Sequence, residues 1–152
     1  MEQEANVMPN NTILIVEDNA DDVELALHGF KDIKSTCNVE VMRDGTSALD
    51  YVFRTSGEAP SNSAEQPALI LLDIGLPDIS GFEVLKRIRA NAASKRIPVV
   101  IFSSSDEASD ITRGYDLGAN SYLQKPLHYD NFVNVLEHLG LYWLTMNLPS
   151  PR

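Results

Sequence analysis

Five short apolar runs, each followed by an amphipathic helical pattern, constrain the fold more than any other feature. The runs lie at residues 12–16, 38–43, 68–72, 97–102 and 121–124. Uninterrupted apolar runs are typical of strands buried on both faces, whereas the alternating run 38–43 indicates a strand nearer the sheet edge. Regular alternation of strands and helices predicts a parallel sheet with right-handed crossovers. We therefore expect one α/β domain, with helices on both faces of a doubly wound, five-stranded parallel sheet.

The helical patterns between these runs carry one apolar stripe each. The first begins at Asp21 and Asp22 and keeps its stripe from Val23 to Ile33. Acidic residues in a first turn suit the positive end of a helix dipole. The remaining helices are expected at 46–54, from Gly81, at 106–117 and from about Tyr129.

Composition narrows the possible functions. The 152 residues carry a net charge of -10, so the chain lacks the positive footprint that nucleic-acid binding needs. No apolar stretch is long enough to span a membrane, and the acidic start is unlike a signal peptide. The single cysteine, Cys37, excludes a disulfide framework. We expect a cytoplasmic protein that binds neither nucleic acid nor membranes.

Functional side chains follow the apolar runs where the strands are expected to end. Glu17 and Asp18 follow the first run, Asp73 the third, Ser103 the fourth and Lys125 the fifth. Parallel strands bring these groups to the carboxyl edge of the sheet, where open α/β sheets bind ligands. Clustered carboxylates repel one another unless a cation such as Mg²⁺ compensates. The set predicts phosphoryl transfer with Asp73 as the nucleophile.

Two other functions fit part of this pattern. An aspartyl phosphatase would also use a strand-end aspartate. The family of this kind resembles an Asp-x-Asp motif whose second aspartate is the acid/base, and that position is Gly75 here. A flavodoxin-like cofactor binder would need a Ser/Thr/Gly-rich phosphate loop after the first strand, where this chain has Glu17 and Asp18. A P-loop is absent from the sequence.

Several motifs together resemble the receiver domain of two-component response regulators, over roughly residues 12–140. They are Ile-Leu-Ile-Val-Glu-Asp-Asn at 13–19, Leu-Leu-Asp-Ile-Gly-Leu-Pro at 71–77, Gly81-Phe82, Ser103-Ser104, Lys125-Pro126 and Asp44-Gly45. The resemblance implies a flavodoxin/CheY-like fold with strand order 2-1-3-4-5. It also implies a phospho-acceptor signalling protein rather than an enzyme, capable only of self-phosphorylation and autodephosphorylation.

The resemblance assigns a metal site. It implies that a histidine kinase phosphorylates Asp73. Asp18, the Asp73 carboxylate and the backbone carbonyl of Gly75 would bind Mg²⁺ directly, and Glu17 would act on the metal through water.

The resemblance also assigns a phosphate contact and a switch. Lys125 would pair with the phosphoryl group, and the Lys125–Pro126 bond would be cis. Ser103 takes the place of the switch hydroxyl, and Tyr122 that of the aromatic that swings inward on activation. Simpler alternatives are that Ser103 merely ends a strand and that Tyr122 is an ordinary half-buried strand residue.

The sequence after the last expected helix is too short for an output domain. We therefore expect the output to be binding, or transfer of the phosphoryl group as a relay intermediate. A receiver-shaped module that is never phosphorylated is a further alternative. The intact set of Asp18, Asp73, Ser103 and Lys125 argues against it.

The C-terminal tail, residues 139–149, is richer in large apolar residues than one buried face requires. An exposed patch of this kind usually marks an interface, and the alternative is that the tail folds back on its own domain. We expect a homodimer through Tyr142, Trp143 and Leu144.

Three features together resemble stand-alone receivers that serve bacterial phytochrome-type histidine kinases. They are the tail, the enlarged surface loop expected at residues 55–67, and the Val-Glu-Asp-Asn-x-x-Asp start at residues 16–22. The expected organisation is a disordered leader at 1–11, a receiver domain at 12–140 and an apolar, interface-forming extension at 141–152.

Overall fold

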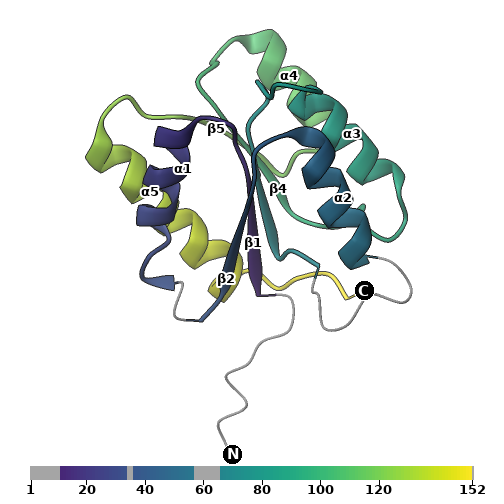
Figure 1. Cartoon of the computed structure of the whole chain (residues 1–152), viewed down its shortest axis with the longest axis horizontal. Helices are drawn as coiled ribbons and strands as arrows, with labels where there is room; N and C mark the ends of the chain where they lie inside the picture. Colours follow the sequence, from purple (N-terminus) through teal and green to yellow (C-terminus); the bar gives the residue numbers. More distant parts are fainter. Residues whose placement is uncertain (1–10, 34–35, 57–65, 152) are drawn as a thin grey trace, which may run out of the picture.

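Five parallel strands form the centre of the molecule, in the order β2-β1-β3-β4-β5 (Figure 1). The computed structural model describes residues 11–33, 36–56 and 66–151. The strands are β1 (Thr12–Val16), β2 (Asn38–Met42), β3 (Leu69–Leu72), β4 (Val99–Ser103) and β5 (Ser121–Gln124). Every neighbouring pair is parallel. The predicted α/β class and the strand order 2-1-3-4-5 are confirmed.

Helices cover both faces of the sheet. They are α1 (Ala20–Gly29), α2 (Gly45–Ser56), α3 (Gly81–Ala90), α4 (Ala108–Asp116) and α5 (Tyr129–Leu141), followed by the π-helix η3 (Tyr142–Met146). In Figure 1, α1 and α5 lie on one side of the sheet and α2, α3 and α4 on the other. None of the helices in the described ranges combines the length and apolar character needed to cross a membrane.

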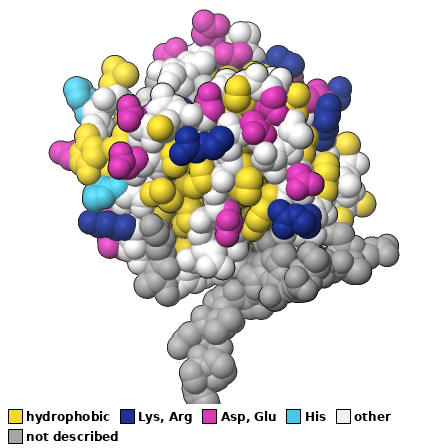
Figure 2. All heavy atoms as spheres, in the orientation of Figure 1, with side chains coloured by type: hydrophobic (Ala, Val, Ile, Leu, Met, Phe, Trp, Pro, Cys, Tyr) yellow, Lys and Arg dark blue, Asp and Glu magenta, His cyan; other side chains and the backbone are white. Residues whose placement is uncertain are grey.

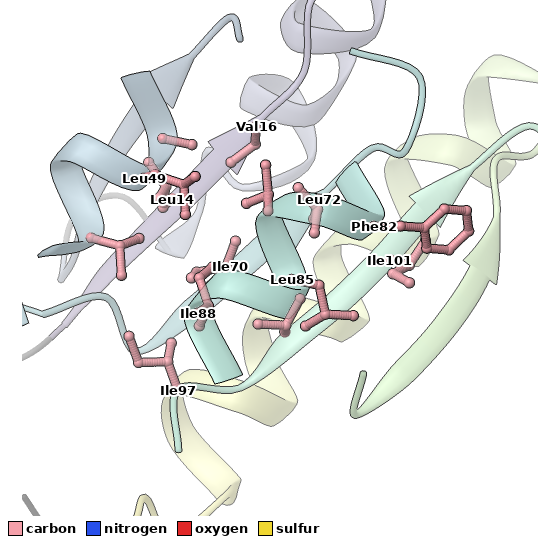
Figure 3. Close-up of a cluster of buried hydrophobic side chains, with 14 residues drawn as sticks. Leu14, Val16, Leu49, Ile70, Leu72, Phe82, Leu85, Ile88, Ile97 and Ile101 are labelled. Atoms are coloured by element: carbon pink, nitrogen blue, oxygen red, sulfur yellow. The ribbon is translucent and has the colours of Figure 1, made fainter. Parts of the chain in front are cut away.

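Alternating side chains of each buried strand serve two separate cores. On β1, Leu14 and Val16 join the cluster beneath α2 and α3, whereas Ile13 and Ile15 join the one beneath α1 and α5. Figure 3 shows the first cluster, in which Leu85 of α3 is among the side chains that point to the strands. Because strand residues alternate between faces, this double burial is what makes the runs uninterrupted.

The helix starts are set by short polar contacts. Asn19 caps α1 by accepting the Asp22 N–H at 3.0 Å, and Ser80 caps α3 by accepting the Phe82 N–H at 3.0 Å. Such caps satisfy N–H groups that have no partner within the helix. The first helix ends at Gly29, earlier than the predicted stripe to Ile33.

Figure 2 shows the face of the molecule seen in Figure 1. Hydrophobic side chains lie at the surface over the edge of the sheet, among mostly acidic groups. Edge strand β2 is only partly covered, with Val39, Val41 and Met42 half-buried. The predicted position of run 38–43 near the sheet edge is therefore confirmed.

The tail continues α5 without a break. Trp143 and Leu144 are half-buried and pack against the core cluster beneath α1 and α5. Tyr142 is 49% exposed, and its ring meets that of Trp143 edge-on at 5.1 Å between centroids. Residues 1–10 of the expected leader and residues 57–65 of the expected loop lie outside the described residues.

Candidate functional site

Asp73 lies directly beyond β3, where the strand gives way to the loop before α3. Its backbone N–H donates to the Val16 carbonyl at 3.0 Å, which continues the pairing with β1. Its side chain is only 12% exposed, and Oδ1 accepts the Ile74 N–H at 2.9 Å. A Cβ on Gly81 would collide with the Asp73 carbonyl oxygen. The glycine therefore allows α3 to begin directly against the end of β3.

Two further carboxylates lie beside Asp73. Glu17 follows β1, donates its N–H to the Met42 carbonyl at 3.0 Å, and is 5% exposed, whereas Asp18 is exposed. One carboxylate oxygen from each of Glu17, Asp18 and Asp73 lies within 4.8 Å of the others. Burial raises the pKa of Glu17 to about 7, with the charge of Asp73 acting in the same direction and Lys125 opposing it.

Lys125 supplies the positive charge at this site. Its Nζ lies 2.7 Å from Glu17 Oε1, 2.8 Å from Asp22 Oδ2 and 3.7 Å from Asp73 Oδ2. The side chain is 8% exposed. Burial works to lower the pKa of Lys125, but its hydrogen bonds to Asp22 and Glu17 outweigh burial and raise the pKa above its ordinary value. The ammonium is therefore fully charged at neutral pH.

The expected switch residues lie on β4 and β5, the two strands that follow β3 in the sheet order. Ser103 ends β4, is buried, and accepts the Ser105 N–H on Oγ at 3.1 Å. Its carbonyl accepts the Lys125 N–H at 2.7 Å, which ties the ends of β4 and β5 together. Tyr122 on β5 is half-buried, and its hydroxyl donates to the Ser105 carbonyl at 3.0 Å. One loop residue, Ser105, thus contacts both.

Gly75 is exposed and close to the acidic cluster. A Cβ built on it would have Asp73 Oδ2, 4.0 Å away, as its nearest neighbour. The expected interface residues Tyr142, Trp143 and Leu144 belong to the C-terminal segment and contribute nothing to this cluster.

One expectation at the site is wrong. The peptide bond between Lys125 and Pro126 is trans, as is every peptide bond in the described part of the chain. Trans is the more stable isomer of X–Pro bonds by about 0.5–1 kcal/mol. The position of the lysine side chain is set here by its carboxylate partners.

Asp22 is the site residue that sequence reasoning missed. The sequence places it in the first turn of α1 and at the end of the Val-Glu-Asp-Asn-x-x-Asp start, but indicates no partner for its carboxylate. Its partner Lys125 is 103 residues away. The available indication was its position one helical turn after Asp18, which places it above the end of β1.

The donor set fits a hard divalent cation. Mg²⁺ prefers oxygen ligands and is usually held by one or two carboxylates together with waters and phosphate. Glu17, Asp18 and Asp73 supply such oxygens at one edge of the sheet. The adjacent ammonium and hydroxyl can contact a phosphoryl group, so the site can bind metal and phosphate side by side.

Comparison with known proteins relates residues 13–137 to the response regulator receiver domain. The chain is 37% identical over 140 residues to the probable methanogenesis regulatory protein FilR2 of Methanothrix harundinacea, covering 91% of this chain and 88% of that protein. It is 34% identical over 151 residues to response regulator Rcp1 of Synechocystis, covering 99% of both.

Two solved structures are similar over almost the whole chain. The phosphorylated cyanobacterial phytochrome response regulator RcpA has a TM-score of 0.84 at 34% identity, covering 93% of this chain and 99% of that one. The Mn(2+)-bound form of Rcp1 has a TM-score of 0.78 at 34% identity, with the same coverage. The latter relative thus binds a divalent metal.

Proposed function

The chain belongs to the response regulator receiver family, and we propose that it signals by accepting a phosphoryl group on Asp73 from a histidine kinase. The observation that carries the proposal is the charge arrangement around this aspartate. Asp73 lies within 4.8 Å of two carboxylates, and the Lys125 ammonium is 3.7 Å away. A partly buried nucleophile with this positive charge beside it suits phosphoryl transfer better than a purely structural role.

Asp18, Asp73 and the carbonyl of Gly75 would hold Mg²⁺, with Glu17 acting through water. The bound cation would neutralise charge between the carboxylates and the incoming phosphoryl group. Lys125, whose Nζ lies 3.7 Å from Asp73 Oδ2, would contact the phosphoryl oxygens. The divalent metal in the Rcp1 structure supports this assignment.

The switch would act through Ser103 and Tyr122. A phosphoryl group adds about two negative charges and strong acceptor oxygens. The Ser103 hydroxyl would donate to a phosphoryl oxygen, and turning towards it would move Oγ relative to the Ser105 N–H that it accepts. Since Tyr122 also contacts Ser105, rearrangement of this loop would change the surface formed by α4, β5 and α5.

The proposed partners are a phytochrome-type histidine kinase and a second copy of this chain. RcpA is a phytochrome response regulator, and this chain matches it over 93% of its length. The apolar extension, with Tyr142, Trp143 and Leu144, would form the homodimer. The activity would be limited to self-phosphorylation and autodephosphorylation.

Incubation with acetyl phosphate and Mg²⁺, followed by intact-mass measurement, tests the central step. We expect a mass gain of one phosphoryl group for the wild type and none for Asp73→Asn. Omission of Mg²⁺ should abolish the gain. The same gain in Asp73→Asn would show that another residue is modified and would contradict the proposal.

A further inference from the structure

The Lys125 ammonium is shared unequally among three carboxylates. It is within hydrogen-bond distance of Glu17 and Asp22, at 2.7 and 2.8 Å, but lies 3.7 Å from Asp73. These three are its ion-pair partners among the described residues. At 3.7 Å the Asp73 oxygen is beyond hydrogen-bond distance, so a hydrogen bond to Asp73 requires the ammonium to shift away from its present partners.

Asp22 is held in place for this contact by the start of α1. Its backbone N–H donates to the capping side chain of Asn19 at 3.0 Å. Asp22 lines the same small pocket as Glu17 and Asp73. Asp21, in the same turn, is instead exposed to solvent.

The two strong partners of Lys125 differ in how easily they can be released. The Glu17 side chain is 6% exposed, so water has little access to replace the contact with Lys125 if the lysine moved away. The Asp22 side chain is 24% exposed and can be rehydrated. Asp22 is therefore the contact that breaks at lower cost.

We propose that Asp22 is a positioning residue that holds Lys125 in competition with a phosphoryl group on Asp73. This inference rests on the proposed function. When Asp73 carries the phosphoryl group, Lys125 leaves Asp22 for the phosphoryl oxygens and Asp22 turns to water. Asp22 thus stabilises only the arrangement without the phosphoryl group, and an interaction made in one of two states shifts the equilibrium towards that state.

Beryllofluoride, a stable analogue of the phosphoryl group, makes the competition measurable without turnover. We would titrate it at fixed Mg²⁺ and follow the bound form by fluorine-19 NMR. Asp22→Asn, which keeps the shape and removes the charge, should bind about three- to tenfold more tightly than the wild type, as loss of a charge-assisted hydrogen bond from the free form predicts. Asp22→Glu should return the affinity towards the wild-type value.

Asp21→Asn is the matched control, because it removes the same charge from the same helical turn without touching Lys125. Any gain it shows measures the general effect of a less negative site on anion binding. A gain in Asp22→Asn no larger than that in Asp21→Asn, or a loss, would overturn the inference. Circular dichroism of both variants would establish that α1 is intact.

The nitrogen-15 resonance of Lys125 Nζ provides a direct readout. Without beryllofluoride it should differ between wild type and Asp22→Asn, and with beryllofluoride the two should converge. Equal resonances in the free proteins would contradict the holding contact. Failure of the wild type to bind beryllofluoride at all would overturn the proposed function, and this inference with it, whereas normal wild-type binding without a gain in Asp22→Asn would overturn this inference alone.

Discussion

The Asp78 carboxylate accepts a hydrogen bond from the Gly45 N–H at 2.8 Å, although 33 residues separate them. Its other oxygen accepts the Thr46 N–H, also at 2.8 Å. Asp78 thus satisfies the first turn of α2 from the loop between β3 and α3, the loop that begins at Asp73. The hydrogen bonds from Thr46 and Gly45 hold the pKa of Asp78 well below its ordinary range.

Asp78→Ala should therefore lower the thermal midpoint by about 2–4 °C, since α2 loses its cap. A depressed pKa contributes stability above the ordinary aspartate value and loses it as the pH falls through the folded-state value. The midpoint of the wild type should thus fall more steeply below about pH 4 than that of Asp78→Asn. Calorimetry across pH tests this, with exposed Asp50→Asn on the same helix as control.

Glu17 has the opposite sign of pH dependence. Burial raises its pKa to about 7, so the folded protein binds this proton more tightly than the unfolded chain does. The contribution of Glu17 to the free energy of unfolding is fully present below its unfolded-state pKa of about 4.3. It is lost as the pH rises through the folded-state pKa of about 7. Without metal, Glu17→Gln should be more stable than the wild type above pH 7, by about 1–3 kcal/mol.

Urea unfolding at pH 5 and pH 8 with a chelator present measures this difference. The difference should be smaller at pH 5, where the wild-type side chain is still neutral in the folded state, than at pH 8. Added Mg²⁺ should reduce the advantage of Glu17→Gln at pH 8, because the cation compensates the ionised cluster. A lower stability of the variant at pH 8 without metal would show that the ion pair with Lys125 outweighs burial.

Gly114 makes room for the Tyr122 ring beneath α4. A Cβ at this position would lie 2.7 Å from Ile101 Cδ1 and 3.2 Å from Tyr122 Cδ2. Gly114→Ala should therefore displace the ring or the helix and cost about 1–3 kcal/mol, despite the better helix propensity of alanine. Loss of the Tyr122–Ser105 hydrogen bond should appear as a changed tyrosine resonance in NMR spectra.

Ser109→Ala, at an exposed position of the same helix, is the control for Gly114→Ala and should leave both stability and spectrum unchanged. Tyr122→Phe separates the hydrogen bond from the packing, because it keeps the ring and removes the hydroxyl. An undisturbed tyrosine resonance in Gly114→Ala would mean that α4, not the ring, gives way.

The sequence predicted the bounds of the strands better than it predicted contacts between residues far apart in the chain. The bounds of β1 and β5 agree with the predicted runs, because the buried and half-buried residues there are adjacent in sequence. The end of α1 was misplaced. A Cβ on Gly29 would lie 2.6 Å from Leu136 Cβ, so the helix ends against α5, a contact between residues more than 100 positions apart.

The same limit applies to the candidate site. Residues at strand ends could be grouped from the sequence because parallel strands place their carboxyl ends at one edge. Asp22 and Asp78 lie outside that rule, since each acts on a partner brought close only by the complete fold. The tail had a similar limit. Its composition indicated an apolar surface, but not which of its apolar side chains pack against the core and which are exposed.

Because the tail has both buried and exposed apolar side chains, the proposed homodimer can be tested without unfolding the domain. Trp143 is half-buried against the core, so Trp143→Ala should lower stability by about 1–3 kcal/mol whether or not a dimer exists. Leu141 and Tyr142 are 48% and 49% exposed, so polar replacements there should spare the fold.

The double variant Leu141→Gln, Tyr142→Gln tests whether the tail forms the proposed interface. If it does, the sedimentation coefficient should shift to that of a monomer, because apolar contacts drive such association. The thermal midpoint should stay unchanged. Glu137→Gln, exposed one turn earlier on α5, should leave the coefficient unchanged. A dimer that persists in the double variant would place the interface elsewhere.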